Sequence, residues 1–274
     1  AMAEKINIFW FRRDLRADDN AGLFHALKSG KPVLPIFIFD KHILNKLQDK
    51  SDRRVAFIHA ALETLQQTIV HAGSSLLIYH DTPENAFKNL VSKYDISAVF
   101  TNHDYEPYAA ERDAGIKKFL DVHGIIMQTF KDQVIFEKDE ILKDDGKPYT
   151  VFTPYSRKWK ATLSETQLDS YSCKKYHSNF FKHRESKIPS LKQLGFLESA
   201  VPFPPNDLPE ELIKKYGKER DFPGIKGTSR LGVHLRFGTI SIRQLAAKTK
   251  PLSETYLNEL IWRDFYHMIL WQFP

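Results

Sequence analysis

The sequence predicts an α/β fold, in which a doubly wound parallel sheet is joined by a long connector to an all-helical region. Three observations lead to this prediction. Short apolar runs alternate with helical patterns through residues 4–130. The periodicity then fades in a segment rich in proline, and it becomes helical again after Gly227. Strands that alternate with helices are typical of a parallel sheet covered by helices on both faces.

The predicted sheet has one strand for each short apolar run. These runs cover residues 6–11, 33–39, 76–79, 98–101 and 125–129. The helical patterns between them cover residues 21–29, 51–71, 82–94 and 109–123. The third helix has the clearest start, because Thr82 is a favourable N-cap and Pro83 suits the first helical position.

Polar residues follow three of the predicted strands, in segments 12–14, 40–42 and 102–106. Ligands of doubly wound sheets bind beyond the carboxyl ends of the strands, so we expect these segments to line a site. The usual dinucleotide and P-loop glycine patterns are absent from the sequence. A structural alternative is that the arginines near the first strand pair with neighbouring aspartates. The residues concerned are Arg12, Arg13, Arg16, Asp14, Asp18 and Asp19.

The long segment after the predicted sheet is too long for a simple loop of a compact domain. We interpret residues 131–205 as an interdomain connector that wraps the surface, with a short helix near residues 155–164. The helical region then covers residues 206–274 and begins with a short helix at 210–216. The lysines and arginines of the connector are interpreted as a solvated surface, with a dedicated binding patch as the alternative.

Composition and charge restrict the class of protein. The chain has 274 residues, a net charge of +6 and a pI near 9.1. This balance favours an anionic partner such as nucleic acid, although a lysine-rich solvated surface produces the same balance. The single cysteine, Cys173, excludes an intramolecular disulfide and fits a reducing, cytoplasmic location. No apolar run approaches the ~20 residues that cross a bilayer, so we expect no membrane partner.

The segment 253–273 predicts one uninterrupted helix with an unusual polar face. Ser253 is a favourable N-cap, and Glu254 suits the positively charged first turn. At helical spacing, aromatic rings alternate on one face with a carboxylate and a guanidinium. These residues are Tyr256, Glu259, Trp262, Arg263 and Tyr266. One interpretation is a buried helix with a Glu–Arg pair, and the other is a pocket wall that stacks flat rings and hydrogen-bonds polar edges.

The segment 227–238 predicts a capped entry into a short helix that Gly238 ends. Thr228 or Ser229 can act as the N-cap. Two hydroxyls, free backbone N–H groups and Arg230 also make this loop a candidate phosphate site. Tyr216 and Arg220 lie just upstream and can add a hydroxyl and a charge. Capping loops are common, so the sequence of this loop alone does not distinguish the two roles.

Four motifs resemble those of the DNA photolyase/cryptochrome family. They are W-F-R-R-D-L-R-x-x-D-N, E-R-D-F-P-x-x-x-G-T-S-R-L, L-x-x-G-x-I-S and N-E-L-I-W-R-D-F-Y, in the order that the family has them. The resemblance is closest to a class I cyclobutane pyrimidine dimer photolyase. It implies an antenna domain at 4–130, a connector at 131–205, and an FAD-binding helical domain of which residues 206–274 are only the first part.

The resemblance also implies a set of flavin contacts. Tyr216 and the residues of the G-T-S-R-L motif stand where the family contacts the FAD phosphates and the nearby ribityl chain. The motif residues are Thr228, Ser229, Arg230 and Leu231. Gly232 stands where a serine is common, so one hydroxyl contact is missing. Tyr256 stands where a tryptophan often lines the flavin cavity, and Arg263 borders the pocket.

The implied activity is light-dependent repair of DNA that contains pyrimidine dimers. In the family, reduced FAD excited by light donates an electron that splits the cyclobutane ring. Glu259 and Trp262 match the pair that meets the flipped dimer, and Glu259 favours cyclobutane dimers, because relatives that act on (6-4) photoproducts usually carry Gln there. Arg220, Arg263 and Tyr266 match positions that face DNA. Alternatives are a (6-4) photolyase, a cryptochrome photoreceptor without repair activity, and a truncated non-catalytic module.

The sequence leaves open the identity of the antenna chromophore and the length of the full protein. Pro107, Tyr108 and Ala109 stand where folate-binding members place Asn and Glu near the pterin. These residues disfavour methenyltetrahydrofolate without deciding the antenna, and the alternatives are a deazaflavin, a second flavin or no antenna. Family members continue well past the N-E-L-I-W-R-D-F-Y motif, so the resemblance implies a chain truncated within the FAD-binding domain. We expect the full-length protein to be a monomer.

Overall fold

The computed structural model describes residues 3–198, 202–219 and 231–274, without the side chains of residues 217–219. The chain divides into two compact units. The sheet unit contains the residues up to Asn102 together with Arg112–Phe130 and Tyr171–Phe203. The helical unit contains His103–Glu111, Lys131–Ser170 and Pro204–Pro274. The predicted domain limits at residues 130 and 205 stay a prediction.

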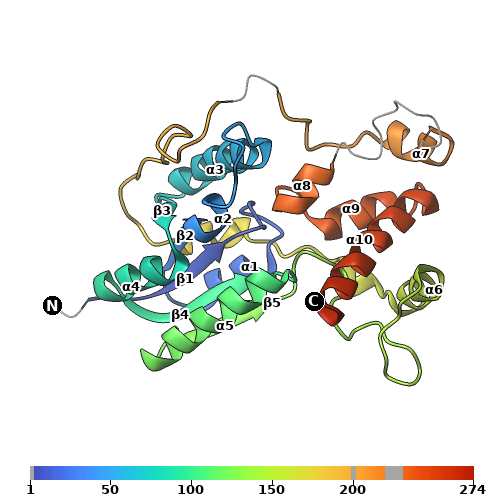
Figure 1. Cartoon of the computed structure of the whole chain (residues 1–274), viewed down its shortest axis with the longest axis horizontal. Helices are drawn as coiled ribbons and strands as arrows, with labels where there is room; N and C mark the ends of the chain where they lie inside the picture. Colours follow the sequence, from blue (N-terminus) through green and yellow to red (C-terminus); the bar gives the residue numbers. More distant parts are fainter. Residues whose placement is uncertain (1–2, 199–201, 220–230) are drawn as a thin grey trace. The chain divides into compact units, whose positions relative to one another are not determined.

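The sheet unit contains a five-stranded parallel sheet in the order β3-β2-β1-β4-β5. The strands are β1 Lys5–Phe11, β2 Val33–Asp40, β3 Leu77–Asp81, β4 Asp95–Asn102 and β5 Ile126–Phe130. All five predicted strands are present, which confirms the α/β class (Figure 1). The strand order reverses at β1, so the carboxyl ends of β1 and β4 lie together at the position where doubly wound sheets bind ligands.

Strand β4 begins earlier than the apolar pattern predicts. Asp95 pairs with Lys5, and Ile96 is buried in the core beside Ile6. The register between β1 and β4 then shifts after Ile6, and the side chain of Asn7 accepts a hydrogen bond from the backbone N–H of Ala98 at 3.0 Å. Polar residues interrupt the apolar run at this irregularity, so the apolar pattern alone does not indicate where the strand begins.

Helices cover the sheet, because successive side chains of a strand point to opposite faces and the apolar ones must be buried. The α-helices of this part of the chain are α1 Ala21–Leu27, α2 Lys41–Leu44, α3 Arg53–His71, α4 Pro83–Lys93 and α5 Pro107–Val122. Ile8 and Trp10 pack into one cluster with Phe87 of α4 and Ile116 of α5, so these two helices lie over the same face (Figure 1). The short α2 was not predicted. It begins where the side chain of Asp40 accepts a hydrogen bond from His42 N at 2.8 Å.

Part of the predicted connector belongs to the sheet unit. The described residues between Tyr171 and Phe203 contain little regular structure apart from the 3-10 helix η2 Lys174–Asn179. Their backbone carbonyls accept hydrogen bonds from side chains of α3: Pro189 O from His59 at 2.8 Å, and Ser186 O from Gln66 at 3.1 Å. In return, His183 donates to Ser75 O at 2.7 Å. These contacts hold an irregular segment in place, because its own backbone forms few hydrogen bonds.

The helical unit contains five α-helices within the ranges that the structure describes. They are α6 Phe152–Thr162, α7 Glu210–Glu219, α8 Gly232–Phe237, α9 Ile242–Thr249 and α10 Glu254–Gln272, with the 3-10 helix η1 Glu165–Leu168 after α6. The predicted cap Ser253 is confirmed, because it accepts from Tyr256 N at 3.1 Å. Ser241 caps α9 in the same way, accepting from Arg243 N at 3.2 Å. Gly238 ends α8 with φ of 69°, as predicted.

One helix of this unit begins slightly earlier than predicted, and one predicted helix start lies outside the described residues. The short helix expected near residue 155 begins at Phe152, because Pro154 lies in the first turn, where a missing N–H costs no helical hydrogen bond. Helix α8 has Leu231 as its N-cap, and the predicted N-caps Thr228 and Ser229 lie outside the described residues. None of the described helices is long and apolar enough to cross a membrane.

Candidate functional site

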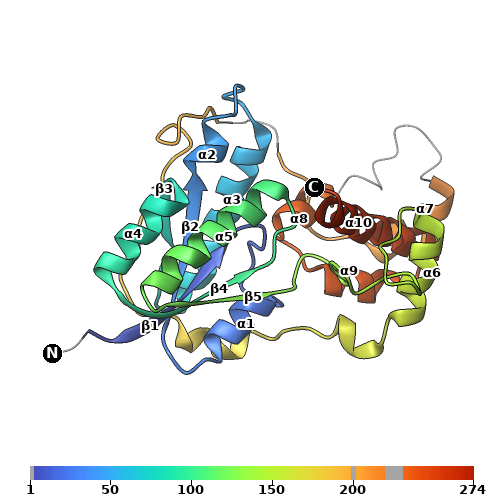
Figure 2. The ribbon, with the colours of Figure 1, turned by 60° about the horizontal axis from the view of Figure 1, so that its bottom comes forward.

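Helix α10 separates a buried side, which includes the predicted flavin contact Tyr256, from the side that carries the predicted lesion-facing residues. Its buried side consists of Tyr256, Leu257, Leu260, Ile261, Asp264, Phe265 and Met268. Within the helical unit it packs against α6 (Figure 2), where the Tyr155 and Phe265 ring centroids lie 5.1 Å apart. The exposed or half-buried residues Glu259, Trp262 and Tyr266 lie on the other side. This division arises because the apolar positions recur at helical spacing.

The structure brings together two residues predicted as flavin contacts. Tyr216 of α7 and Tyr256 of α10 are both buried, and their ring centroids lie 4.8 Å apart at an interplanar angle of 67°. Burial raises the pKa of Tyr256 to about 12, with smaller contributions from Tyr216 and Glu259. Its hydroxyl therefore stays protonated and neutral at physiological pH.

The remaining predicted flavin contacts are described only in part. Leu231 is buried, and Gly232 is exposed at the start of α8 with no atom within 4 Å of the position of a Cβ. Thr228, Ser229 and Arg230 lie outside the described residues, as does Arg220, the predicted DNA contact. The roles assigned to these residues stay predictions.

The predicted lesion-facing residues form an aromatic surface on α10. Trp262 is half-buried, and its ring lies parallel to that of Phe152, with 3.7 Å between centroids and an interplanar angle of 5°. Tyr266 lies 5.5 Å from the Trp262 ring at 29° and is 61% exposed. Glu259, one turn before Trp262, is exposed. The surface thus combines stacked rings with an accessible carboxylate. Phe152 was not predicted, because it lies on another helix far away in the sequence.

Arg263 makes backbone contacts inside the helical unit. Its guanidinium donates a hydrogen bond to the carbonyl of Gln133 and another to the carbonyl of Leu235, the latter at 3.1 Å. These bonds connect α10 both to the segment that precedes α6 and to α8. Its predicted role beside the pocket or DNA stays a prediction.

Asp264 is a buried anchor that the sequence analysis missed. Its Oδ2 accepts hydrogen bonds from Ile135 N at 3.1 Å, from Phe136 N at 3.0 Å and from Trp159 Nε1 at 2.9 Å. Burial raises its pKa to about 6, and these hydrogen bonds and Arg263 act in the opposite direction. A signal was present in the sequence, because Asp264 is an acidic residue on the apolar side of the predicted helix.

The segment after β4 is divided between the two units after Asn102, and its predicted role in lining a site stays a prediction. Tyr105 and His103 both donate hydrogen bonds to Oε2 of Glu137, that from His103 Nδ1 at 2.7 Å. Burial alone would raise the pKa of Glu137, but these hydrogen bonds and the neighbouring positive charges outweigh burial and lower it. Asn102 instead belongs to a network of the sheet unit.

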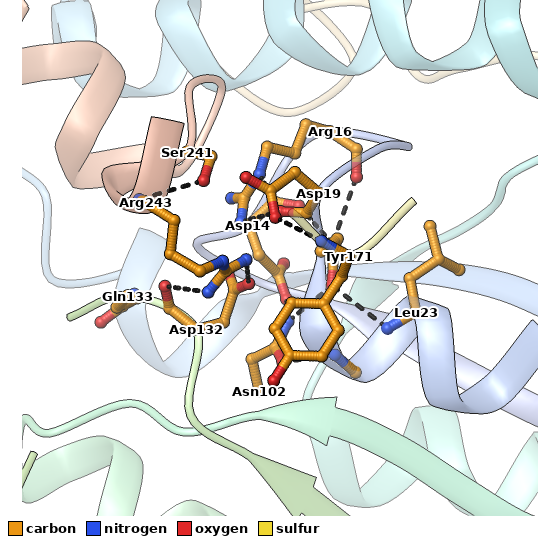
Figure 3. A network of polar contacts seen from close by, with 12 residues as sticks. Asp14, Arg16, Asp19, Leu23, Asn102, Asp132, Gln133, Tyr171, Ser241 and Arg243 are labelled. Carbon is orange, nitrogen blue, oxygen red and sulfur yellow. Dashed lines mark hydrogen bonds and ion pairs between the residues drawn. The ribbon is translucent and has the colours of Figure 1, made fainter. Parts of the chain in front are cut away.

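The polar network of the sheet unit surrounds the carboxyl ends of β1 and β4. Asn102 donates to Asp14 at 2.6 Å (Figure 3). It also donates to Asn20 at 2.8 Å, and its Oδ1 accepts from Gly22 N at 2.8 Å. Gly22 is required here, because a Cβ at this position would lie 2.8 Å from that Oδ1 atom. Asn102 therefore connects both strand ends to α1.

Two arginines near these strands contact acidic residues, one of them an aspartate that the structural alternative named. Arg12 pairs with Asp113, and Arg16 donates to the backbone carbonyl of Asp19 at 2.9 Å. In the helical unit, Arg243 and Asp132 form a buried ion pair at 2.8 Å (Figure 3).

The comparisons with known proteins agree with the motifs. A family model described as DNA photolyase matches residues 7–172, which is more than half of the 274 residues. The chain therefore belongs to the DNA photolyase family. This confirms the family that the four motifs predicted.

Similar proteins include deoxyribodipyrimidine photo-lyases from Synechococcus sp. and Halobacterium salinarum, each 32% identical over 97% of this chain. The matches cover 60% and 61% of those proteins, so the chain spans about three fifths of the length of these curated relatives. Another relative is an uncharacterized 31.6 kDa protein from Synechococcus, which is 29% identical. That match covers 96% of this chain and 100% of that protein.

Solved structures have the same fold. A bacterial class III photolyase from Agrobacterium tumefaciens has a TM-score of 0.82 and 24% identity, covering 100% of this chain and 60% of that one, which establishes the fold alone. An archaeal photolyase from Sulfolobus tokodaii, solved with two FAD molecules, has a TM-score of 0.74 and 26% identity. That match covers 98% of this chain and 60% of the archaeal chain.

Proposed function

We propose that this chain forms part of a light-dependent DNA repair enzyme that uses FAD to split cyclobutane pyrimidine dimers. The observation that carries the proposal is the exposed side of α10, where Glu259 precedes Trp262 by one turn and Tyr266 continues the aromatic surface. Their positions match the family residues that meet a flipped dimer. The match to deoxyribodipyrimidine photo-lyases supports the same reaction class.

The described residues fit a flavin in one respect. Tyr216 and Tyr256 are buried phenols that pack edge to face, and the raised pKa of Tyr256 keeps that hydroxyl neutral. Such a wall suits an uncharged ring system. They would line the flavin cavity, with Leu231 and Gly232 near the ribityl chain. When bound and reduced, FAD supplies the electron for the ring-splitting step, and the protein positions the reactants and tunes their electrostatics.

The lesion-facing residues have separate roles in the proposal. Trp262 and Tyr266 offer ring faces and edges to the extruded bases, and stacking of this kind contributes ~1–3 kcal/mol per base in single-strand binders. Glu259 accepts hydrogen bonds from the N–H groups of the bases, and these bonds stabilise the bound dimer. Flipping favours the lesion, because a damaged and mispaired base costs less to unstack.

Further elements of the proposal concern partners and location. The partner is DNA that contains pyrimidine dimers, and the net charge of +6 supports binding to its phosphates. The antenna is a deazaflavin, a second flavin or methenyltetrahydrofolate, and the sheet unit would hold it. The complete protein would act as a monomer in the cytoplasm, a location consistent with the buried, unoxidised Cys173.

The decisive experiment measures repair by the complete protein. FAD-loaded protein, expressed from the whole reading frame that contains this chain, is mixed with a thymine-dimer oligonucleotide and illuminated with blue light. Loss of dimers under light, and not in darkness, is the expected result. Repair of a (6-4) photoproduct instead would reassign the lesion. Bound flavin without any repair would favour a cryptochrome-type photoreceptor.

A second candidate function is a non-catalytic module of the photolyase family. It is favoured by the 31.6 kDa relative, which this chain matches along 100% of its length. Such a module would retain the sheet unit and the first helices of the helical unit. A purified protein without flavin absorption that still folds would support this candidate over the enzyme.

A further inference from the structure

Phe152 is the first residue of α6, and its ring lies almost flat against that of Trp262. The centroids are 3.7 Å apart and the planes differ by 5°. Aromatic pairs generally prefer offset or edge-to-face arrangements with centroids about 4.5–7 Å apart. The preferences of the two rings alone therefore do not explain this arrangement, so the surrounding framework must impose it.

That framework is the packing of α6 against α10. Trp159 of α6 donates a hydrogen bond to the buried carboxylate of Asp264 on α10 at 2.9 Å. Tyr155 packs against Phe265 with 5.1 Å between ring centroids, and Phe152 packs edge to face on Phe265 at 5.9 Å. The successive contacts of Phe152, Tyr155 and Trp159 determine how α6 lies along α10. Phe152 is thereby held at the Trp262 ring.

A flat neighbour at this distance restricts the rotation of a half-buried tryptophan. The terminal side-chain torsion of tryptophan has a broad, roughly two-fold preference. Rotation of the Trp262 ring away from the observed plane would drive its edge into the Phe152 ring. Trp262 is therefore oriented before any ligand binds, and less conformational freedom is lost on binding.

We propose that Phe152 is a positioning residue that fixes the plane of Trp262 for a flipped pyrimidine dimer. This inference rests on the proposed function, because it assigns Phe152 to the same lesion-facing surface. Phe152 acts through Trp262 and does not itself need to contact the lesion. Losing the ring should weaken binding of dimer-containing DNA and leave binding of undamaged DNA unchanged.

The test compares four variants of the complete FAD-loaded protein. Phe152→Leu removes the ring, Phe152→Tyr restores one, Trp262→Ala removes the residue that Phe152 positions, and Val151→Ala changes the exposed neighbour. Equilibrium binding of dimer-containing and undamaged duplexes is measured for each. We expect Phe152→Leu to weaken dimer binding by about three- to tenfold, the effect of losing one aromatic pair. Phe152→Tyr and Val151→Ala should retain wild-type affinity.

A spectroscopic readout distinguishes positioning from general stabilisation. The near-ultraviolet circular dichroism of each protein, minus that of its Trp262→Phe derivative, isolates the signal of Trp262. This signal should fall roughly twofold in Phe152→Leu, since the ring then samples several orientations, and it should return in Phe152→Tyr. If Phe152→Leu folds poorly, Phe152→Met replaces it, because methionine keeps most of the volume without a flat ring.

The outcomes separate the inference from the proposed function. Unchanged dimer binding and an unchanged Trp262 signal in Phe152→Leu would overturn the positioning role, provided that Trp262→Ala weakens dimer binding. Unchanged dimer binding in Trp262→Ala would remove Trp262 from the substrate site, and the proposed function would then lose the observation that carries it. Weakened dimer binding together with a reduced Trp262 signal, both restored by Phe152→Tyr, is the result that supports the inference.

Discussion

The carboxylate of Asp264 on α10 accepts a hydrogen bond from the indole Nε1 of Trp159 on α6, with 2.9 Å between the two atoms. The same oxygen accepts the backbone N–H groups of Ile135 and Phe136. One buried side chain thus connects three segments of the helical unit. The exposed side of α10, which carries Glu259 and Trp262, depends on this anchor for its orientation.

Replacing Asp264 by alanine should strongly destabilise the protein. Three buried donors would lose their acceptor, and each such group costs about 1–3 kcal/mol when it is left unsatisfied. We expect the free energy of unfolding to fall by at least ~3 kcal/mol, measured by urea denaturation. Asp139→Ala, at an acidic residue outside this core, is the control. Equal stability of both variants would contradict the anchor role.

The stability contributed by Asp264 should depend on pH in an unusual direction. Burial raises its folded-state pKa to about 6, whereas the unfolded value is about 3.9. Between these values the folded chain binds more protons than the unfolded chain, so stability falls as pH rises from about 4 to about 6. Asp264→Asn should lack this component. The measurement is the difference in unfolding free energy between wild type and variant across this range, and a flat difference would contradict the prediction.

Glu137 should show the opposite pH dependence. Its folded-state pKa is lowered, because the hydrogen bonds from His103 and Tyr105 outweigh burial. The stability that it contributes is therefore present above its unfolded pKa and is lost as pH falls through the folded value. Glu137→Gln should destabilise the protein by about 1–2 kcal/mol at neutral pH. Denaturation at pH 7 and at strongly acidic pH should show this difference shrinking in acid.

Glu259→Ala should slow repair more than it weakens binding to undamaged DNA. Its carboxylate is proposed to meet the dimer and not the phosphate backbone. We expect the repair rate at saturating DNA to fall by about tenfold or more, by analogy with other positioned acid–base groups. Glu254→Ala serves as the control, because Glu254 is an exposed carboxylate of the same helix. A repair rate equal to that of wild type would exclude Glu259 from the reaction.

Trp262→Ala should weaken binding to dimer-containing DNA by about tenfold, the effect of losing one stacking partner. Trp271→Ala is the matched control, since Trp271 is an exposed tryptophan on the same helix. Fluorescence anisotropy with damaged and undamaged duplexes measures both affinities. Equal losses on the two duplexes would indicate general DNA binding in place of lesion recognition.

Local pattern predicted most of the fold. The strands β1 and β2 are buried along nearly their whole length, and such continuous apolar runs are visible without any knowledge of their partners. The caps Ser241 and Ser253 bond to residues in the first turn of their own helices, so their effect is local as well. Polar residues hid the start of β4, where burial of Ile96 depends on the neighbouring strand.

The candidate site was predictable only along its own helix. The spacing of Glu259, Trp262 and Tyr266 identified the exposed side of α10, because these residues are neighbours at helical period. The residues that support this side were not predictable in the same way. Asp264 and Trp159 are separated by 105 residues in the sequence, and nothing in either local pattern links them.

The sequence by itself determined the family, the order of strands and helices, and the helix that carries the proposed lesion-facing residues, since each depends on local motifs and periodicity. Only the tertiary structure decided that Phe152 lies flat on Trp262 and that Glu137 accepts hydrogen bonds from His103 and Tyr105. It also decided that the segment Tyr171–Phe203 belongs to the sheet unit. The physical reason is that these contacts join distant segments, and their geometry follows from how the elements pack.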